Sequence, residues 1–257
     1  EAGIRGNARR FRQAFSILPG FREFFAVKVL PNPFVMKILK EEGFGVDCSS
    51  LPELMLAEKI GNVNENIMFS SNDTPADEYK KAKELGAIIN LDDISHIPFL
   101  EKHAGMPELI CFRYNPGPER QGNEMIGDPK EAKYGFTREQ LFEGYRLCGE
   151  KGAERFGLHT MIISNELNPE FFIETAKMMF ELAAEIKEKL GIKLEFINLG
   201  GGLGIPYKPE HKSLNYEKLA DKIKDLYDEI IVKNELSGLK IFFECGRIIT
   251  GPYGFLV

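Results

Sequence analysis

Short apolar runs alternate with longer stretches of helical periodicity along the whole chain, and this alternation constrains the fold more than any other feature. Eight runs have the length and composition of strands, and they cover residues 23–29, 45–48, 67–70, 87–91, 109–114, 155–163, 194–199 and 240–244. Repeated strand, helix and strand units favour parallel pairing through right-handed crossovers. Eight units predict an α/β fold, the (β/α)8 TIM barrel, occupying residues 1–257 as one domain; a doubly wound open sheet is the alternative.

The stretches between these runs carry apolar residues at three- and four-residue spacing and have ordinary helix start and stop signals. The clearest helical patterns cover residues 32–43, 50–61, 74–86, 169–190 and 216–235. Thr74 is the expected N-cap of the third of these helices, with Pro75 at its first helical position. One segment departs from the rhythm: residues 115–136 form a long loop rich in Gly, Pro and charge. In a barrel such a loop belongs to the active face.

Composition excludes several classes of function. The net charge of -6 and the pI near 5.5 argue against a nucleic-acid surface. No apolar segment approaches the roughly 20 residues that cross a bilayer, and no signal peptide begins the chain, so a cytoplasmic protein without membrane contact is expected. The four cysteines are far apart and no His cluster has metal-ligand spacing, which predicts reduced structural thiols and no metal site.

The seventh run ends in the letters INLGGGLG, so Gly200, Gly201, Gly202 and Gly204 follow a strand directly. Glycines at a strand end allow backbone N–H groups to turn toward a phosphate, because no Cβ obstructs the approach. A plain tight turn is the alternative interpretation. The loops after strands seven and eight of a barrel commonly bind phosphate, and the spacing matches neither a dinucleotide fingerprint nor a P-loop. A phosphate on a small cofactor fits this position better.

Four further polar residues lie on or just after the predicted strands. Glu244 and Arg247 follow the eighth run in FFECGR, where they contact a ligand or simply pair with each other. His159 and Met161 lie two residues apart in FGLHTMIIS, hence on the same face of a strand, and a structural role for the histidine is the alternative. Arg113 in FRYNPG is another inward or rim cation.

Lys28 closes the first run in FFAVKVLPNP, an almost wholly apolar segment. Apolar surroundings would lower the pKa of its amine and make it available to form a Schiff base. Taken alone, the lysine is better explained as a side chain that extends its ammonium into solvent. Together with a glycine phosphate cradle and a carboxylate, an amine at the same barrel mouth indicates pyridoxal phosphate, which requires that set of groups.

At this point the sequence resembles the fold-type III, alanine-racemase-like pyridoxal-phosphate decarboxylases, and within them the diaminopimelate decarboxylase branch. The resemblance covers nearly the whole chain. It is carried by FFAVKVLPNP, GFGVDCSSLPEL, FRYNPG with AKYGF, INLGGGLG and ECGR, five motifs in the family's order. It implies pyridoxal 5'-phosphate as the cofactor and a cytoplasmic enzyme of amino-acid biosynthesis.

The resemblance also implies roles for individual residues. Lys28 becomes the Schiff-base lysine, and Glu244 contacts the pyridine nitrogen. The phosphate is held by the N–H groups of the glycine loop, with the site completed from two other segments; the residues concerned are Gly200, Gly201, Gly202, Gly246, Arg247 and Ser164. Arg113 and Arg247 are the implied contacts of the substrate.

The sequence departs from the family pattern at two places. The family's His-x-His-x-Gly-Ser reads here His159-Thr160-Met161-Ile162-Ile163-Ser164, which places Met161 where a histidine stacks on the cofactor ring. A thioether over an aromatic face is a favourable contact, and His159 is the other candidate for that position. Cys245 replaces the proline of the EPGR motif.

In this family a β-domain follows the barrel and supplies a Cys-containing motif and a Tyr to the site, partly across a homodimer interface. The sequence stops at Val257 without that domain and begins without Met inside a helical stretch, so we expect a barrel-domain fragment truncated at both ends. The implied activity is decarboxylation of a diamino acid, with meso-diaminopimelate, which yields lysine, as the first substrate. Decarboxylation of D-ornithine, D-lysine or another polyamine precursor, and a non-catalytic cofactor-binding or regulatory homologue, remain alternatives.

Overall fold

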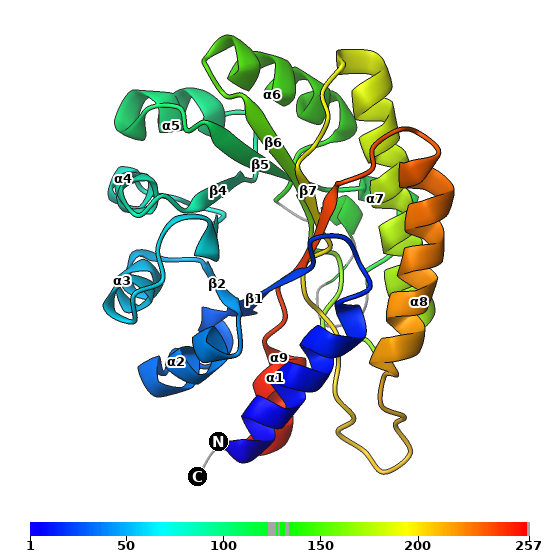
Figure 1. The fold of residues 1–257 in the computed structure, drawn as a ribbon. Coiled ribbons are helices and arrows are strands. Elements are labelled where there is room, and N and C mark those ends of the chain that lie inside the picture. Colours follow the sequence, from blue (N-terminus) through cyan, green and yellow to red (C-terminus); the bar gives the residue numbers. More distant parts are fainter. Residues whose placement is uncertain (123–126, 128, 132–133, 256–257) are drawn as a thin grey trace.

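Eight parallel strands close into a barrel in the computed structural model, which describes residues 1–122, 127, 129–131 and 134–255. The strands pair in chain order from β1 to β8, and β8 returns to β1 (Figure 1). Their bounds are β1 Arg22–Ala26, β2 Gly45–Cys48, β3 Ile67–Ser70, β4 Ile88–Leu91, β5 Leu109–Tyr114, β6 Arg155–Thr160, β7 Phe196–Asn198 and β8 Lys240–Phe243. The predicted (β/α)8 barrel is confirmed, and the open sheet is excluded.

Helices surround the barrel on the outside (Figure 1). Their bounds are α1 Ala2–Phe15, α2 Pro33–Glu41, α3 Leu51–Lys59, α4 Ala76–Glu84, α5 His96–Ala104, α6 Arg138–Glu150, α7 Pro169–Leu190, α8 Tyr216–Leu226 and α9 Arg247–Thr250. The first helix precedes β1 and packs against the short α9: the Asn7 side-chain amide donates to the carbonyls of Ile248 and Ile249 at 2.7 and 3.0 Å. This contact fixes the turn of helix that begins with Arg247.

One of the long predicted helices has the expected bounds, and two other helix predictions differ from the structure. The expected helix over residues 169–190 is α7 itself. The expected cap at Thr74 is wrong, because Pro75 takes the N-cap position and the Thr74 hydroxyl donates to the Ser71 carbonyl instead. The helix expected over 216–235 is shorter, since α8 ends at Leu226 and a π-helical turn, Tyr227–Val232, continues it.

Four strands end earlier than their apolar runs predicted; the eighth ends at Phe243 instead of Glu244. The first leaves the sheet after Ala26, and Lys28 lies in a 3-10 turn, Val27–Val29, rather than at the end of the strand. The sixth ends at Thr160, so Met161 lies beyond it. The seventh is confined to Phe196–Asn198. After the sixth and seventh strands the sequence stays apolar because the turn packs against neighbouring loops and is buried or half-buried. After the first strand Val27 is buried, but Lys28 and Val29 are exposed at the barrel mouth.

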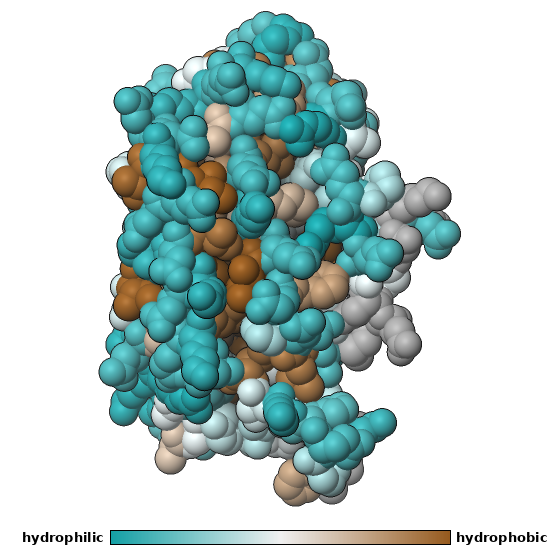
Figure 2. Space-filling model, turned by 90° about the vertical axis from the view of Figure 1, so that its right-hand side faces the viewer, coloured by the Kyte–Doolittle hydropathy of each residue, from teal (hydrophilic) through white to brown (hydrophobic). Residues whose placement is uncertain are grey.

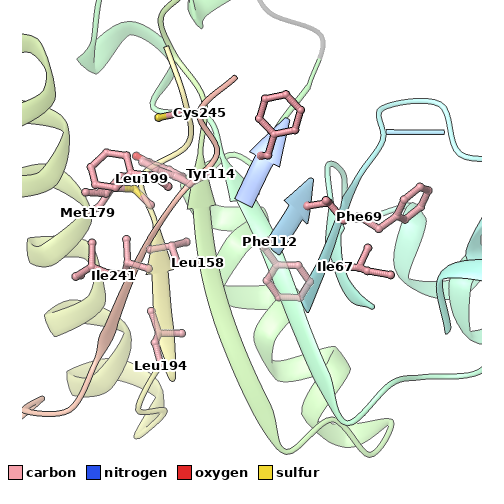
Figure 3. Packing of buried hydrophobic residues seen from close by; sticks show 14 of the residues in the cluster. Ile67, Phe69, Phe112, Tyr114, Leu158, Met179, Leu194, Leu199, Ile241 and Cys245 are labelled. Atoms are coloured by element: carbon pink, nitrogen blue, oxygen red, sulfur yellow. The ribbon is translucent and has the colours of Figure 1, made fainter. Parts of the chain in front are cut away.

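Two hydrophobic clusters fill the molecule. The larger lies between the strands and the helices, and Figure 3 shows part of it. The smaller fills the barrel interior with Phe24, Met68, Ile88, Leu109, Cys111, Phe196 and Phe242. The rings of Phe196 and Phe242 stack at a centroid distance of 4.5 Å. This floor closes one end of the barrel and leaves the polar side chains at the carboxyl ends of the strands to line the other.

The outer surface is mainly hydrophilic on the side of α7 and α8, with apolar patches between the polar side chains (Figure 2). Within the part of the chain that the structure describes, no helix is long and apolar enough to span a membrane. The four cysteines Cys48, Cys111, Cys148 and Cys245 are buried and free, as predicted.

Candidate active site

A cavity of about 450 Å³ opens at the carboxyl ends of the strands. It is lined by residues from nearly every part of the barrel mouth, among them Lys28, Asp47, Ser70, Arg113, His159, Met161, Ser164, Gly202, Tyr207, Glu244, Gly246 and Arg247. Nearly all the residues singled out from the sequence therefore meet in one place. Among the glycines of the loop after β7, Gly200, Gly201 and Gly204 lie outside the cavity lining.

Lys28 projects from the 3-10 turn that follows β1, and its side chain is exposed at the mouth. Asp47 of β2 is 3% exposed, its Oδ1 has no hydrogen-bond partner, and its neighbour in the sheet register is Ala26, just before the lysine turn. Burial raises the pKa of the Asp47 carboxyl, the charge of Glu244 raises it further, and the Lys28 ammonium only partly opposes this. Lys28 thus shares the cavity lining with a buried carboxyl group whose pKa is raised.

Glu244 follows β8 and is buried between two donors. The Nε2 of His159 lies 2.9 Å from its Oε2, and the side-chain amide of Asn198 donates to its Oε1 at 2.7 Å. Burial alone would raise the pKa of Glu244, but contacts with His159, Lys28 and Arg113 outweigh it, so the pKa lies below the usual value. Glu244 is therefore an ionised carboxylate inside the barrel.

The alternative pairing of Glu244 with Arg247 is not seen. Within the described residues no ion pair joins these two side chains, and the Arg247 guanidinium donates to the Tyr207 hydroxyl at 2.7 Å. Both residues still line the same cavity, so the carboxylate and the guanidinium remain separately available to a ligand.

Arg113 lies inside the mouth and is 8% exposed. Its Nε is 2.9 Å from Oδ1 of Asp92, at the end of β4, and the Tyr134 ring covers the guanidinium at 5.1 Å. Burial raises the pKa of the Asp92 carboxyl even though Arg113 opposes this. The sheet register places Arg113 beside His159, and His159 beside Asn198, as one tier of polar side chains across β5, β6 and β7.

The glycine loop after β7 packs directly against three other backbone segments. A Cβ on Gly200 would lie 2.2 Å from the Thr160 carbonyl oxygen, one on Gly201 would lie 2.3 Å from that of Glu244, and one on Gly202 would lie 2.5 Å from that of Ile163. Each distance is far below a van der Waals contact. Glycine is required here because the loop fills the space between the ends of β6 and β8.

Two of the predicted phosphate donors are already engaged. The Gly200 N–H donates to the Asn198 side chain at 2.9 Å, and the Gly201 N–H points at the Met161 sulfur at 3.4 Å. The expectation that all three N–H groups face a ligand therefore differs from the structure at Gly200 and Gly201, whose N–H groups close the turn. Gly202 and Gly246 do line the cavity, together with Ser164 and Arg247.

A family model described as "Pyridoxal-dependent decarboxylase, pyridoxal binding domain" matches residues 2–251, nearly the whole chain. The chain belongs to the pyridoxal-dependent decarboxylases. Similar proteins include Protein TabA of Pseudomonas amygdali pv. tabaci, 38% identical over all of this chain, and the diaminopimelate decarboxylase of Methanothermobacter thermautotrophicus, 34% identical over all of it. This pyridoxal-dependent decarboxylase chain spans 60% of the length of each of these two relatives.

Solved structures agree with this assignment. A diaminopimelate decarboxylase from M. jannaschii in complex with L-lysine superposes with a TM-score of 0.85 at 27% identity, over 96% of this chain and 59% of that one. The diaminopimelate decarboxylase of Helicobacter pylori, at 24% identity and a TM-score of 0.82, supports the fold. The resemblance stated from the sequence is thereby confirmed at the level of the family and the barrel.

The cofactor that this family implies, pyridoxal 5'-phosphate, fits the groups at the mouth. Glu244 offers an ionised carboxylate to a protonated ring nitrogen, Lys28 offers an exposed amine, and Arg247 offers a guanidinium beside glycines that leave room for a phosphate. Within the described residues no cluster of His, Cys, Asp or Glu side chains could hold a metal ion. The motif letters AKYGF contribute only Tyr134, Gly135 and Phe136, because Ala132 and Lys133 lie outside the described residues.

Sequence reasoning missed several polar residues of the site. Asp47, Asn90 and Asn198 interrupt buried strands, and a single polar residue inside an apolar run was the signal that could have identified them. Tyr207 gave no such signal, because it lies in an irregular segment and comes beside Arg247 only through the fold.

Replacing Asp47 with asparagine should stabilise the cofactor-free protein at neutral pH by about 1 kcal/mol, or roughly 2–4 °C in Tm. A carboxyl whose pKa is raised in the folded state loses stability as pH rises above the ordinary value of 3.8, and asparagine removes that loss. The gain should vanish near pH 3 and grow toward pH 8. Urea unfolding across this range measures it, with exposed Asp73→Asn as the matched control. If the stability of Asp47→Asn relative to wild type falls between pH 3 and pH 8, instead of rising, the assignment of a raised pKa to Asp47 is contradicted.

Replacing Gly201 with alanine should destabilise the fold by about 1–3 kcal/mol, because the new methyl group meets the Glu244 carbonyl at 2.3 Å and one of two backbones must shift. Chemical denaturation gives the free energy of unfolding. Gly149→Ala in α6 is the control, since its nearest atom is 3.9 Å away and alanine favours a helix. Equal effects of the two substitutions would show that the glycine loop has room for a side chain.

Proposed function

We propose that the full-length protein is a pyridoxal-phosphate-dependent carboxy-lyase of a diamino acid, with meso-diaminopimelate as the first substrate and lysine as the product. The observation that carries the proposal is the meeting of Lys28, an ionised Glu244 and the Arg247 guanidinium at one cavity of a barrel from this family. The relatives named diaminopimelate decarboxylase support the substrate class. TabA, at 38% identity, does not carry the name of a diaminopimelate decarboxylase, so the test below also varies the chain length and the stereochemistry of the substrate.

Each residue at the mouth has a defined part in this proposal. Lys28 would hold the cofactor covalently through its amine and give it up to the amine of the substrate. When bound, the cofactor supplies an electron sink for the pair of electrons that remains on carbon when CO2 leaves. Glu244 would keep a proton on the ring nitrogen. Met161, whose thioether lines the cavity in place of the family's histidine, would lie against the ring.

The remaining groups would orient phosphate and substrate. Gly202, Gly246, Ser164 and Arg247 would surround the phosphate, with Gly200 and Gly201 shaping the loop behind them. The Arg113 guanidinium would receive a carboxylate of the substrate, because its side chain lines the cavity and its ion pair with Asp92 is made through Nε. We further propose that the full-length protein works as a cytoplasmic homodimer, which light scattering of the purified protein tests.

The deciding experiment measures CO2 release by full-length protein loaded with pyridoxal phosphate. The substrates are meso-diaminopimelate, L-lysine, D-lysine and D-ornithine at equal concentration. Release from meso-diaminopimelate, with stoichiometric lysine, is the expected result. Turnover confined to D-lysine or D-ornithine would show that the protein decarboxylates a polyamine precursor instead. A bound cofactor with no release from any of the four would identify a non-catalytic binding protein.

A further inference from the structure

A chain of five polar side chains crosses the barrel at the cavity, three of them in its lining, and the proposed function uses only one of the five. The five are Ser70, Asn90, His159, Glu244 and Asn198. We propose that His159 is a positioning residue, held by Asn90 as a neutral ring that donates from Nε2 and keeps the Glu244 carboxylate negative and aimed at the cavity. This inference rests on the proposed function, because it concerns the group that would meet the cofactor ring.

The geometry of the chain is continuous. The side-chain amide nitrogen of Asn90 lies 3.2 Å from the Ser70 hydroxyl oxygen and 3.2 Å from His159 Nδ1. The opposite ring nitrogen, Nε2, lies 2.9 Å from Glu244 Oε2. Asn90 and His159 are each 1% exposed, so water does not compete for these contacts. The imidazole is therefore fixed at both nitrogens between β4 and the end of β8.

The amide of Asn90 decides where the proton on the ring lies. In the observed orientation its two N–H groups serve two acceptors, Ser70 and His159 Nδ1, and only its carbonyl oxygen is buried without a partner. Exchanging oxygen and nitrogen would let the oxygen accept from both neighbours, but it would leave two buried N–H groups unsatisfied instead of one carbonyl. The observed orientation makes Nδ1 an acceptor, so the single ring proton lies on Nε2 and points at Glu244.

With His159 neutral, the Glu244 carboxylate is held ionised by the hydrogen bond from Nε2 and by the positive charges of Lys28 and Arg113, not by an imidazolium charge. The histidine and carboxylate together keep a charge of minus one, whereas an imidazolium would cancel the charge of Glu244. A carboxylate oxygen accepts more than one hydrogen bond, so Glu244 keeps lone pairs for a protonated ring nitrogen while His159 and Asn198 fix its plane. His159 thus acts on the cofactor through Glu244, and this differs from the stacking role that the sequence left open for it.

The first test needs no cofactor. Nitrogen-15 NMR of full-length protein labelled at histidine, at neutral pH, should show one ring with unprotonated Nδ1 and protonated Nε2. His159→Gln should remove that pair of signals and so assign them. Protonation of both nitrogens, or a proton on Nδ1 alone, would overturn the inference. This measurement stands even if the protein binds no pyridoxal phosphate, an outcome that would end the proposed function separately.

The second test measures affinity by titrating full-length protein with pyridoxal phosphate and with an analogue that carries carbon in place of the ring nitrogen. Loss of a charge-assisted hydrogen bond predicts that His159→Leu weakens binding of pyridoxal phosphate by about tenfold or more. His159→Gln, whose amide can still donate to Glu244, should stay within about threefold of wild type. The analogue should bind wild type and His159→Leu alike. Equal weakening for both ligands would mean that His159 merely fills space, and circular dichroism verifies that the variants are folded.

Discussion

Replacing Lys28 with alanine should abolish the visible absorption of the cofactor-loaded protein and lower the rate of decarboxylation by at least about 10⁴-fold. Within the described cavity lining, Lys28 supplies the lysine amine, and the other cations at that mouth, Arg113 and Arg247, carry guanidinium groups that do not form Schiff bases. The loss should appear in kcat as well as in cofactor affinity. Spectrophotometric titration and CO2 release measure the two effects separately.

The fold should survive this substitution, because the Lys28 side chain is exposed and packs no core. Lys37→Ala is the matched control, since Lys37 is also exposed and lies one helix further along, in α2. A Lys28→Ala protein that keeps the visible band would remove the lysine from the mechanism. If Lys28→Ala loses the band and also unfolds at a lower temperature than the Lys37→Ala control, the loss of the band would reflect a damaged fold and not a missing amine.

Much of the fold could be predicted from the sequence because each unit carries its own signal. Residues 45–48, 67–70 and 109–114 are strands with the predicted bounds, since each is a short apolar run closed by a polar or turn segment. The failures arise where the sequence stays apolar after the strand has ended, because hydropathy does not distinguish such a turn from a strand. The turn after Met161 is buried against neighbouring loops, whereas the apolar Val29 beside Lys28 is exposed at the barrel mouth.

The residues of the site could be predicted only where a local sequence pattern marks them. Three adjacent glycines and a lysine inside an apolar run are visible in the sequence, and both lie at the mouth. The partner of Glu244 was not visible, because His159 meets it only through closure of the barrel, which places the ends of β6 and β8 on either side of the short β7. A pairing with Arg247, three residues away, was the local alternative, and the tertiary contact replaces it.

Replacing Glu244 with glutamine should lower kcat by about 10²–10³-fold while the cofactor still forms its bond to Lys28. The substitution keeps the shape of the side chain but removes the negative charge that would hold a proton on the ring nitrogen. An electron sink without that proton is weaker, so the rate falls more than the affinity does. Single-turnover measurements with saturating cofactor separate the two. A variant with unchanged kcat would show that the carboxylate has no part in the chemistry.

The negative charge of Glu244 should also affect the free energy of unfolding, and the direction of the effect with pH can be predicted. The pKa of Glu244 lies below its ordinary value of 4.5 in the folded protein, so its ionised form contributes stability above that pH and loses it as the pH falls through the folded pKa. Glu23 provides the opposite case: it is 2% exposed, burial raises its pKa, and one of its oxygens has no hydrogen-bond partner. At pH 7 we therefore expect Glu244→Gln to destabilise the cofactor-free fold and Glu23→Gln to stabilise it. Both differences from wild type should shrink toward pH 3 in urea unfolding, and differences of the same sign at pH 7 would contradict the assignment of the ionised carboxylate to Glu244.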